Sequence, residues 1–117
     1  GPELRFSAVN ATGERAEMWE SLPLTGSPVT FEVQVKSDLP LRVFMLKNGY
    51  PFESMTVEAR ESDWQTLTFV DQPEQRAYYR LELHSIYQSE LHPYLQWRDF
   101  NTMQALSNPI WIGPVEA

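Results

Sequence analysis

The sequence predicts an all-β protein, an immunoglobulin-like antiparallel β-sandwich of about seven strands with a long ordered loop before the last strand. Three observations favour this fold class. Apolar and polar residues alternate with a period of two along most of the chain, as they do in strands with one buried face. Turn residues recur about every ten positions, which is typical of sandwiches. No stretch keeps a 3.6-residue apolar period, and nine prolines disfavour long helices.

The first two expected strands lie near the N-terminus and over residues 29–36. Leu4, Phe6 and Ala8 alternate with polar residues in the first. The second has the clearest alternation in the chain, which predicts one buried and one exposed face. Its expected buried face is formed by Val29, Phe31, Val33 and Val35. Between these strands, residues 16–21 fit either one helical turn or a short strand or loop.

A hairpin is expected in the middle of the chain. Residues 41–46 form a dense apolar run that ends at Lys47, and Asn48-Gly49 follows. Asn-Gly is the strongest short-range hairpin signal, because both residues of such a turn take positive φ. We therefore expect a return strand over residues 54–59, with Met55 and Val57 facing inward.

Two more strands are expected over residues 63–70 and 76–86. The first holds Trp64, Leu67 and Phe69. In the second, Tyr79, Leu81 and Leu83 fall on the inner side, and Arg80, Glu82 and His84 fall on the outer side. Tyr79, two residues before Leu81, fits either a tyrosine corner, whose hydroxyl bonds upstream backbone, or a plain inward-facing strand tyrosine.

The last strand is expected over about residues 106–112. Pro109 cannot donate a ladder hydrogen bond, so it belongs at the start of an edge strand or at a bulge. Pairing then continues through Ile110 and Ile112, and Gly113-Pro114 ends the strand.

Composition limits the classes of function. The chain has 117 residues, enough for one core, and we expect residues 1–117 to form a single domain. A net charge of −7 disfavours nucleic-acid binding, which needs clustered Lys and Arg. The absence of cysteine excludes disulfides and Cys-ligated metals. No apolar run is long enough for a membrane span, and no signal segment opens the chain, so a soluble chain of open compartment is expected.

The residues that carry chemistry are few. His84 and His92 are the two histidines, and both are expected on the surface, without a metal-binding or catalytic partner. No nucleophile elbow or phosphate-binding glycine loop is present. Outward strand carboxylates such as Glu32 and Glu82 fit a soluble surface. The sequence therefore predicts no catalytic residue, no metal site and no cofactor, and the chain by itself is not expected to be an enzyme.

Aromatic residues are the candidate interaction site. The segment 88–104 is longer than a tight connection and is rich in aromatic side chains. Trp111 alternates with two isoleucines and is expected to face outward. The candidate residues are Tyr87, Tyr94, Trp97, Phe100 and Trp111. Three interpretations stay open: a satellite cluster beneath a folded-over loop, a contact with a protein or another domain, and a carbohydrate site.

Several short motifs follow one another along the chain in an order that indicates a family resemblance. It begins with residues 1–6 and 26–33, continues through 41–49, which end in Asn-Gly, and 77–83 (Ala-Tyr-Tyr-Arg-Leu-Glu-Leu), and closes with 105–112, which contain Ser-Asn-Pro-Ile. This order resembles the C-terminal β-sandwich appended to bacterial metallohydrolases of the polymerase-and-histidinol-phosphatase (PHP) superfamily, CehA/McbA type. The insertion at residues 88–104 departs from that pattern.

The resemblance implies an accessory domain excised from a larger protein. In that family a preceding catalytic domain supplies the metal ligands, and none of its ligand motifs occurs in this sequence. The implied role is non-catalytic: the sandwich packs on and supports an N-terminal metal-dependent phosphoesterase domain of the same polypeptide. The alternative is a stand-alone carbohydrate- or protein-binding sandwich that uses the aromatic region 87–111.

Overall fold

The computed structural model describes residues 2–86 and 103–113, and these form strands, turns and loops without a helix. The strands are β1 (Glu3–Val9), β2 (Arg15–Glu17), β3 (Ser21–Leu22), β4 (Val29–Ser37), β5 (Leu41–Lys47), β6 (Tyr50–Val57), β7 (Arg60–Asp71), β8 (Ala77–Ser85), β9 (Met103–Leu106) and β10 (Ile110–Ile112).

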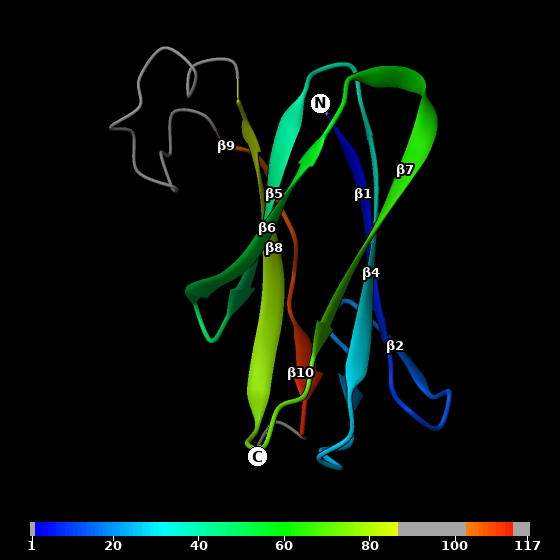
Figure 1. The fold of residues 1–117 in the computed structure, drawn as a ribbon, viewed down its shortest axis with the longest axis vertical. Coiled ribbons are helices and arrows are strands. Elements are labelled where there is room, and N and C mark those ends of the chain that lie inside the picture. Colours follow the sequence, from blue (N-terminus) through cyan, green and yellow to red (C-terminus); the bar gives the residue numbers. More distant parts are fainter. Residues whose placement is uncertain (1, 87–102, 114–117) are drawn as a thin grey trace.

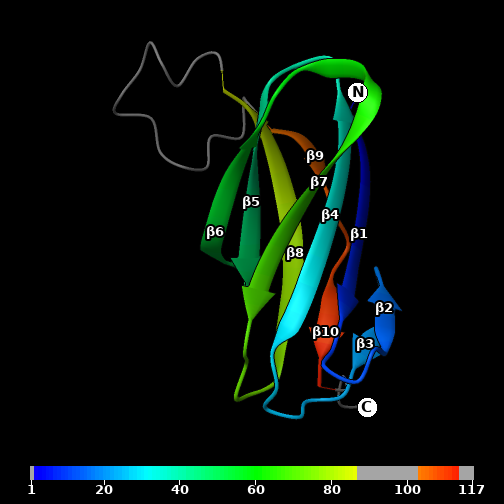
Figure 2. The ribbon, with the colours of Figure 1, turned by 45° about the vertical axis from the view of Figure 1, so that its right-hand side comes forward.

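The strands form two sheets packed face to face. One has the order β2-β1-β4-β7, and the other has the order β3-β10-β8-β5-β6, with β9 also paired to β8. Figure 1 shows β1, β4 and β7 in one layer and β5, β6 and β8 in the other, and Figure 2 shows the same layers after rotation. Neighbouring strands are antiparallel except β10 and β3, which are parallel. The all-β sandwich that the sequence predicts is therefore confirmed, with ten described strands where about seven were expected.

The core lies between the two sheets, and its best-predicted part is β4. The four alternating apolar residues of β4 are all buried, and their polar neighbours are not. Phe31 of β4 packs on Phe6 of β1, with ring centroids 6.0 Å apart, and on Tyr79 of β8, with centroids 4.4 Å apart. Each such buried side chain stabilises the fold by roughly 1.5–3 kcal/mol. These rings join the two sheets.

The Asn-Gly hairpin connects β5 to β6 as expected. Asn48 has φ 53° and Gly49 has φ 86°, the pair of positive values that a type I′ turn requires. Tyr50 starts β6 directly after the turn, four positions before the predicted start at residue 54. Val57 is buried as predicted, and Met55 lies on the inner face as predicted, opposite the core residue Val43, but its side chain stays 42% exposed. β6 is the last strand of its sheet, so its inner side chains are covered from one side only.

The expected last strand is two strands, β9 and β10. Between them Ser107 takes over the bonding to β8: its N–H donates to the Leu81 carbonyl (3.0 Å), and its Oγ accepts from the Leu81 N–H (2.7 Å). Pro109 directly precedes β10, as predicted. However, β10 lies between β3 and β8 and is no edge strand, because Ser21–Leu22 form the short strand β3 outside it.

Candidate functional site

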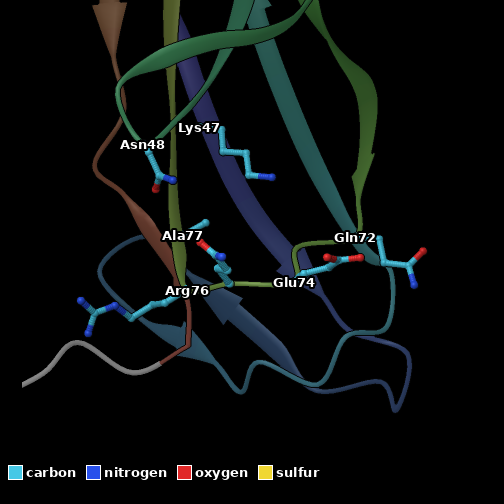
Figure 3. A pocket seen from close by; sticks show the side chains of 7 residues that line it. Lys47, Asn48, Gln72, Glu74, Arg76 and Ala77 are labelled. Carbon is cyan, nitrogen blue, oxygen red and sulfur yellow. The ribbon is translucent and has the colours of Figure 1, made fainter.

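A cleft opens at one end of the sandwich, between the β5–β6 hairpin and the β7–β8 connection (Figure 3). Its volume is about 370 Å³. It is lined by Lys47, Asn48, Gln72, Glu74, Gln75, Arg76 and Ala77. Figure 3 shows Lys47 and Asn48 on one side, Gln72 and Glu74 on the other, and the Arg76 side chain extending away from them. No sequence motif had indicated this cleft.

Several polar groups of the cleft already have internal partners. Asn48 Oδ1 accepts from the Tyr78 N–H (3.0 Å), and the Asn48 N–H donates to the Tyr78 carbonyl (2.9 Å). Gln72 Nε2 donates to the Gly26 carbonyl (2.8 Å). These bonds tie the hairpin to β8 and the β7–β8 connection to the loop before β4. The cleft is thus a junction of structural hydrogen bonds, and these groups support the fold.

A charged cluster lies beside the cleft and joins the two sheets. Asp71, at the end of β7, accepts a hydrogen bond from the Tyr79 hydroxyl (2.6 Å) and pairs with Lys47 Nζ (2.8 Å) through the same oxygen, Oδ2. Burial alone would raise the pKa of the Asp71 carboxyl, but the bonds from Lys47, Tyr79 and the Gln72 N–H outweigh it and lower the pKa. Burial, and then the neighbouring Asp71 carboxylate, raise the pKa of the Tyr79 hydroxyl. The cluster therefore holds a carboxylate next to a protonated phenol.

The same contact decides the role of Tyr79. A tyrosine corner needs a backbone acceptor upstream of the ring. The Tyr79 hydroxyl donates to the Asp71 side chain, eight positions upstream, and its ring is fully buried against Phe31. Of the two sequence interpretations, the plain inward-facing tyrosine is correct. Its hydroxyl serves the inter-sheet cluster instead of a corner.

Trp111 lies on the outer face of the six-stranded sheet, as its alternation with two isoleucines predicts. It is half-buried and stands opposite Tyr78 in the β10–β8 register. The two rings pack with centroids 5.2 Å apart and a 46° angle between planes. The structure thus pairs Trp111 with Tyr78, which the sequence had not singled out. The other candidate residues, Tyr87, Tyr94, Trp97 and Phe100, lie outside the described residues, as does His92.

The outer face of β8 differs from the prediction. Glu82 is fully buried and His84 is 3% exposed, so their expected exposure was wrong. Glu82 Oε2 pairs with Arg80 Nη1 (2.9 Å), and Glu82 Oε1 lies 3.1 Å from His84 Nε2. The His84 ring meets the Phe44 ring edge-on, with centroids 5.3 Å apart. β8 runs between β5 and β9, and Phe44 stands directly opposite Glu82, so bulky neighbours keep water from this face.

A second tryptophan that the sequence reasoning missed stands on the β2–β3 connection. The Glu20 N–H donates to the Glu17 carbonyl (3.0 Å), which closes a four-residue turn. Trp19 is the third residue of this turn and has φ 73°, the value at which type II turns require glycine. Its side chain is 68% exposed. The left-handed conformation costs a non-glycine residue roughly 1–2 kcal/mol, and the exposed ring recovers little of this through packing.

Among residues 2–86 and 103–113, no group of three or more His, Asp or Glu side chains is arranged to hold a metal ion. The described part of the chain also contains no helix long and apolar enough to cross a membrane.

Comparison with known proteins identifies the fold. No protein-family model matches the chain, and no curated protein matches it either. Among solved structures it is similar to the solution NMR structure of a CARDB domain from Pyrococcus furiosus, with a TM-score of 0.50 and 15% sequence identity. The match covers 96% of this chain and 95% of that domain. At this identity the likeness establishes the β-sandwich fold and nothing about what the chain binds.

Proposed function

We propose that this chain is a non-catalytic interaction domain, which docks through the outer face of its six-stranded sheet onto a folded neighbouring domain. The observation that carries the proposal is the Tyr78–Trp111 pair, which is half-buried on the outer face of that sheet. Paired, rigid aromatic side chains of this kind are the usual anchors of protein interfaces. Leu106 of β9 is exposed on the same sheet, opposite Glu82.

The cleft supports the same proposal. Its Asn48 and Gln72 side chains are held by backbone partners, and Lys47 is held by Asp71. A catalytic site instead needs polar groups that converge on a bound substrate. The neighbour that we propose is a metal-dependent hydrolase domain of the PHP superfamily in the same polypeptide, following the resemblance of the motifs.

The test uses the whole polypeptide that contains this chain. The reading frame upstream of Gly1 is expected to encode His- and Asp-rich ligand motifs. In that polypeptide, Trp111→Ala is expected to lower the melting temperature of the catalytic domain by several degrees, because the docking contact is lost. Trp64→Ala, on the other sheet, is the matched control and should leave the melting temperature of the catalytic domain unchanged. Equal effects of the two variants on that temperature, or an upstream frame without a hydrolase, would contradict the proposal.

A carbohydrate ligand is the second candidate function, and the same pair favours it. Aromatic rings stack against the C–H faces of sugars, and Tyr78 and Trp111 present adjacent ring surfaces. Calorimetric titration with a set of oligosaccharides distinguishes the two functions. Saturable heat that Trp111→Ala abolishes would support the carbohydrate site, whereas its absence across the set would remove this candidate.

A further inference from the structure

Among the described strands, β7 has a partner along only one of its two edges. It is twelve residues long and pairs with β4 alone among the described strands, through Gln65–Asp71 against Val29–Val35 and, after a register shift, through Arg60 against Ser37. In Figure 2, β7 runs along the outside of the layer that also contains β4 and β1. An edge strand presents a row of backbone N–H and C=O groups that another strand can pair with.

The other described edge strands are short or carry proline and charge, whereas the charges of β7 lie outside residues 64–70. β6 has Pro51 and Glu53 near its start, while β2, β3 and β9 are only three, two and four residues long. Proline, charge and shortness are the usual protections of sheet edges. Residues 64–70 (Trp-Gln-Thr-Leu-Thr-Phe-Val) contain no charge, no proline and no glycine. This composition favours intermolecular strand pairing.

The accessible part of this edge is complementary to itself. The chain crosses between sheets close to Gln65, whose Nε2 donates to the Glu58 carbonyl (2.6 Å), and Asp71 is held in the charged cluster. The five residues between them, Thr-Leu-Thr-Phe-Val, alternate β-branched and large apolar side chains symmetrically about Thr68. An antiparallel pairing centred on Thr68 sets Thr66 opposite Val70 of another copy, and Gln65 opposite Asp71, so no like charges meet.

We propose that two copies of this chain pair antiparallel through β7, about a two-fold axis at Thr68. The two four-stranded sheets then become one continuous eight-stranded sheet (4 + 4). Val70, 54% exposed in the single chain, is covered by the second copy. Because such an interface uses the same surface of both copies, it closes at the dimer.

The size and charge of the interface set its strength. Five paired residues a side bury less than the roughly 1,200–2,000 Å² of stable complexes. Each copy also carries a net charge of −7, and this repulsion is screened beyond about 8 Å at physiological ionic strength. The dimer is therefore concentration-dependent and strengthens with salt.

Sedimentation of the isolated chain, from micromolar to millimolar concentration, tests this proposal. The wild type is expected to shift from monomer to dimer. Thr66→Lys combined with Val70→Lys sets lysines opposite each other twice and should leave a monomer at all concentrations. Thr66→Lys combined with Val70→Glu sets opposite charges together and should restore the dimer. Both positions are exposed, and melting curves verify that each variant is folded.

The matched control places two lysines on the exposed face of the other long edge, by Ser54→Lys with Thr56→Lys in β6. This variant should dimerise like the wild type. A wild type that stays monomeric, a dimer that survives two lysines in β7, or a dimer that the β6 control abolishes would each overturn the proposal. The experiment is independent of the proposed docking function, because Trp111→Ala should leave this dimer intact.

Discussion

The outer faces of the two sheets have similar strand patterns and different environments. On the four-stranded sheet, β4 presents polar residues such as Glu32 and Gln34 to solvent, and Trp64 is covered on one side by the Arg5 guanidinium, 4.2 Å from its ring. On the six-stranded sheet, Phe44, Glu82 and His84 are buried on the outer face. An alternating pattern therefore tells which face is apolar, but the neighbouring strands decide whether the other face meets water.

The largest difference between the two outer faces is expected when one glutamate is removed from each and the loss of stability is compared. Glu82→Ala is expected to cost about 3–5 kcal/mol, because it leaves the Arg80 guanidinium, whose side chain is 21% exposed, without its carboxylate. Glu32→Ala, on the other sheet, is expected to cost less than about 1 kcal/mol, since Glu32 only approaches Arg15 at 4.0 Å in solvent. Urea denaturation measures both. Glu82→Gln keeps the shape of the side chain and should lower the free energy of unfolding by less than Glu82→Ala. Equal losses of stability in Glu82→Ala and Glu32→Ala would contradict the difference between the two faces.

Aromatic residues on the two faces offer a second comparison. Phe44→Ala is expected to cost about 3 kcal/mol, because it opens a cavity beside the buried His84 ring. Trp64→Ala removes a larger ring, but this ring is only half-buried and its cation–π partner Arg5 is exposed, so we expect the free energy of unfolding to fall by about 1 kcal/mol. Thermal unfolding of both variants shows which of the two substitutions lowers stability more. A Trp64 variant that is less stable than the Phe44 variant would show that the four-stranded face is also a packed layer.

The cluster that joins the sheets predicts a pH dependence. The pKa of the Asp71 carboxyl is lowered in the folded chain, so its contribution to stability is fully present above its ordinary value of 3.8 and is lost as the pH falls through the lower, folded value. Asp71→Asn should cost about 1–2 kcal/mol at neutral pH, from the lost charged hydrogen bonds. The free-energy difference from the wild type should shrink below pH 3.8, as urea titrations at several pH values would measure. A difference that stays constant with pH would contradict this assignment.

The smallest change in the free energy of unfolding is expected at Trp19, on the β2–β3 connection between the two sheets. Trp19→Gly relieves a left-handed conformation and should raise the free energy of unfolding by up to about 1 kcal/mol. Trp19→Ala is the control, because it removes the ring and keeps the Cβ that causes the strain. Calorimetry should find the glycine variant more stable than the alanine variant. The reverse order would mean that the turn does not store strain.

The sequence was sufficient for features that depend on local pattern. The buried face of β4 follows from alternation alone, and the β5–β6 turn follows from Asn48-Gly49, because both signals lie within a few adjacent residues. The dense run at residues 41–46 also carried information that alternation did not. A continuous apolar stretch is typical of a strand covered on both faces. This stretch forms β5, which pairs with β8 and places Phe44 opposite Glu82.

The features that the sequence did not predict depend on contacts between distant strands. Glu82 is buried on a face where Phe44 of another strand stands opposite it. The Asp71–Tyr79 bond depends on how the two sheets are placed across the core. Trp19 had no local signal, because a positive φ is normally marked by glycine or asparagine and tryptophan disfavours it.

The bond network around Asp71 has a kinetic consequence. Asp71 belongs to one sheet, and Lys47 and Tyr79 belong to the other, so the network closes only after both sheets have formed and met. Contacts that are absent from the transition state for folding slow unfolding without speeding folding. We therefore expect the loss of the Asp71 network to speed the unfolding of the chain more than it slows folding.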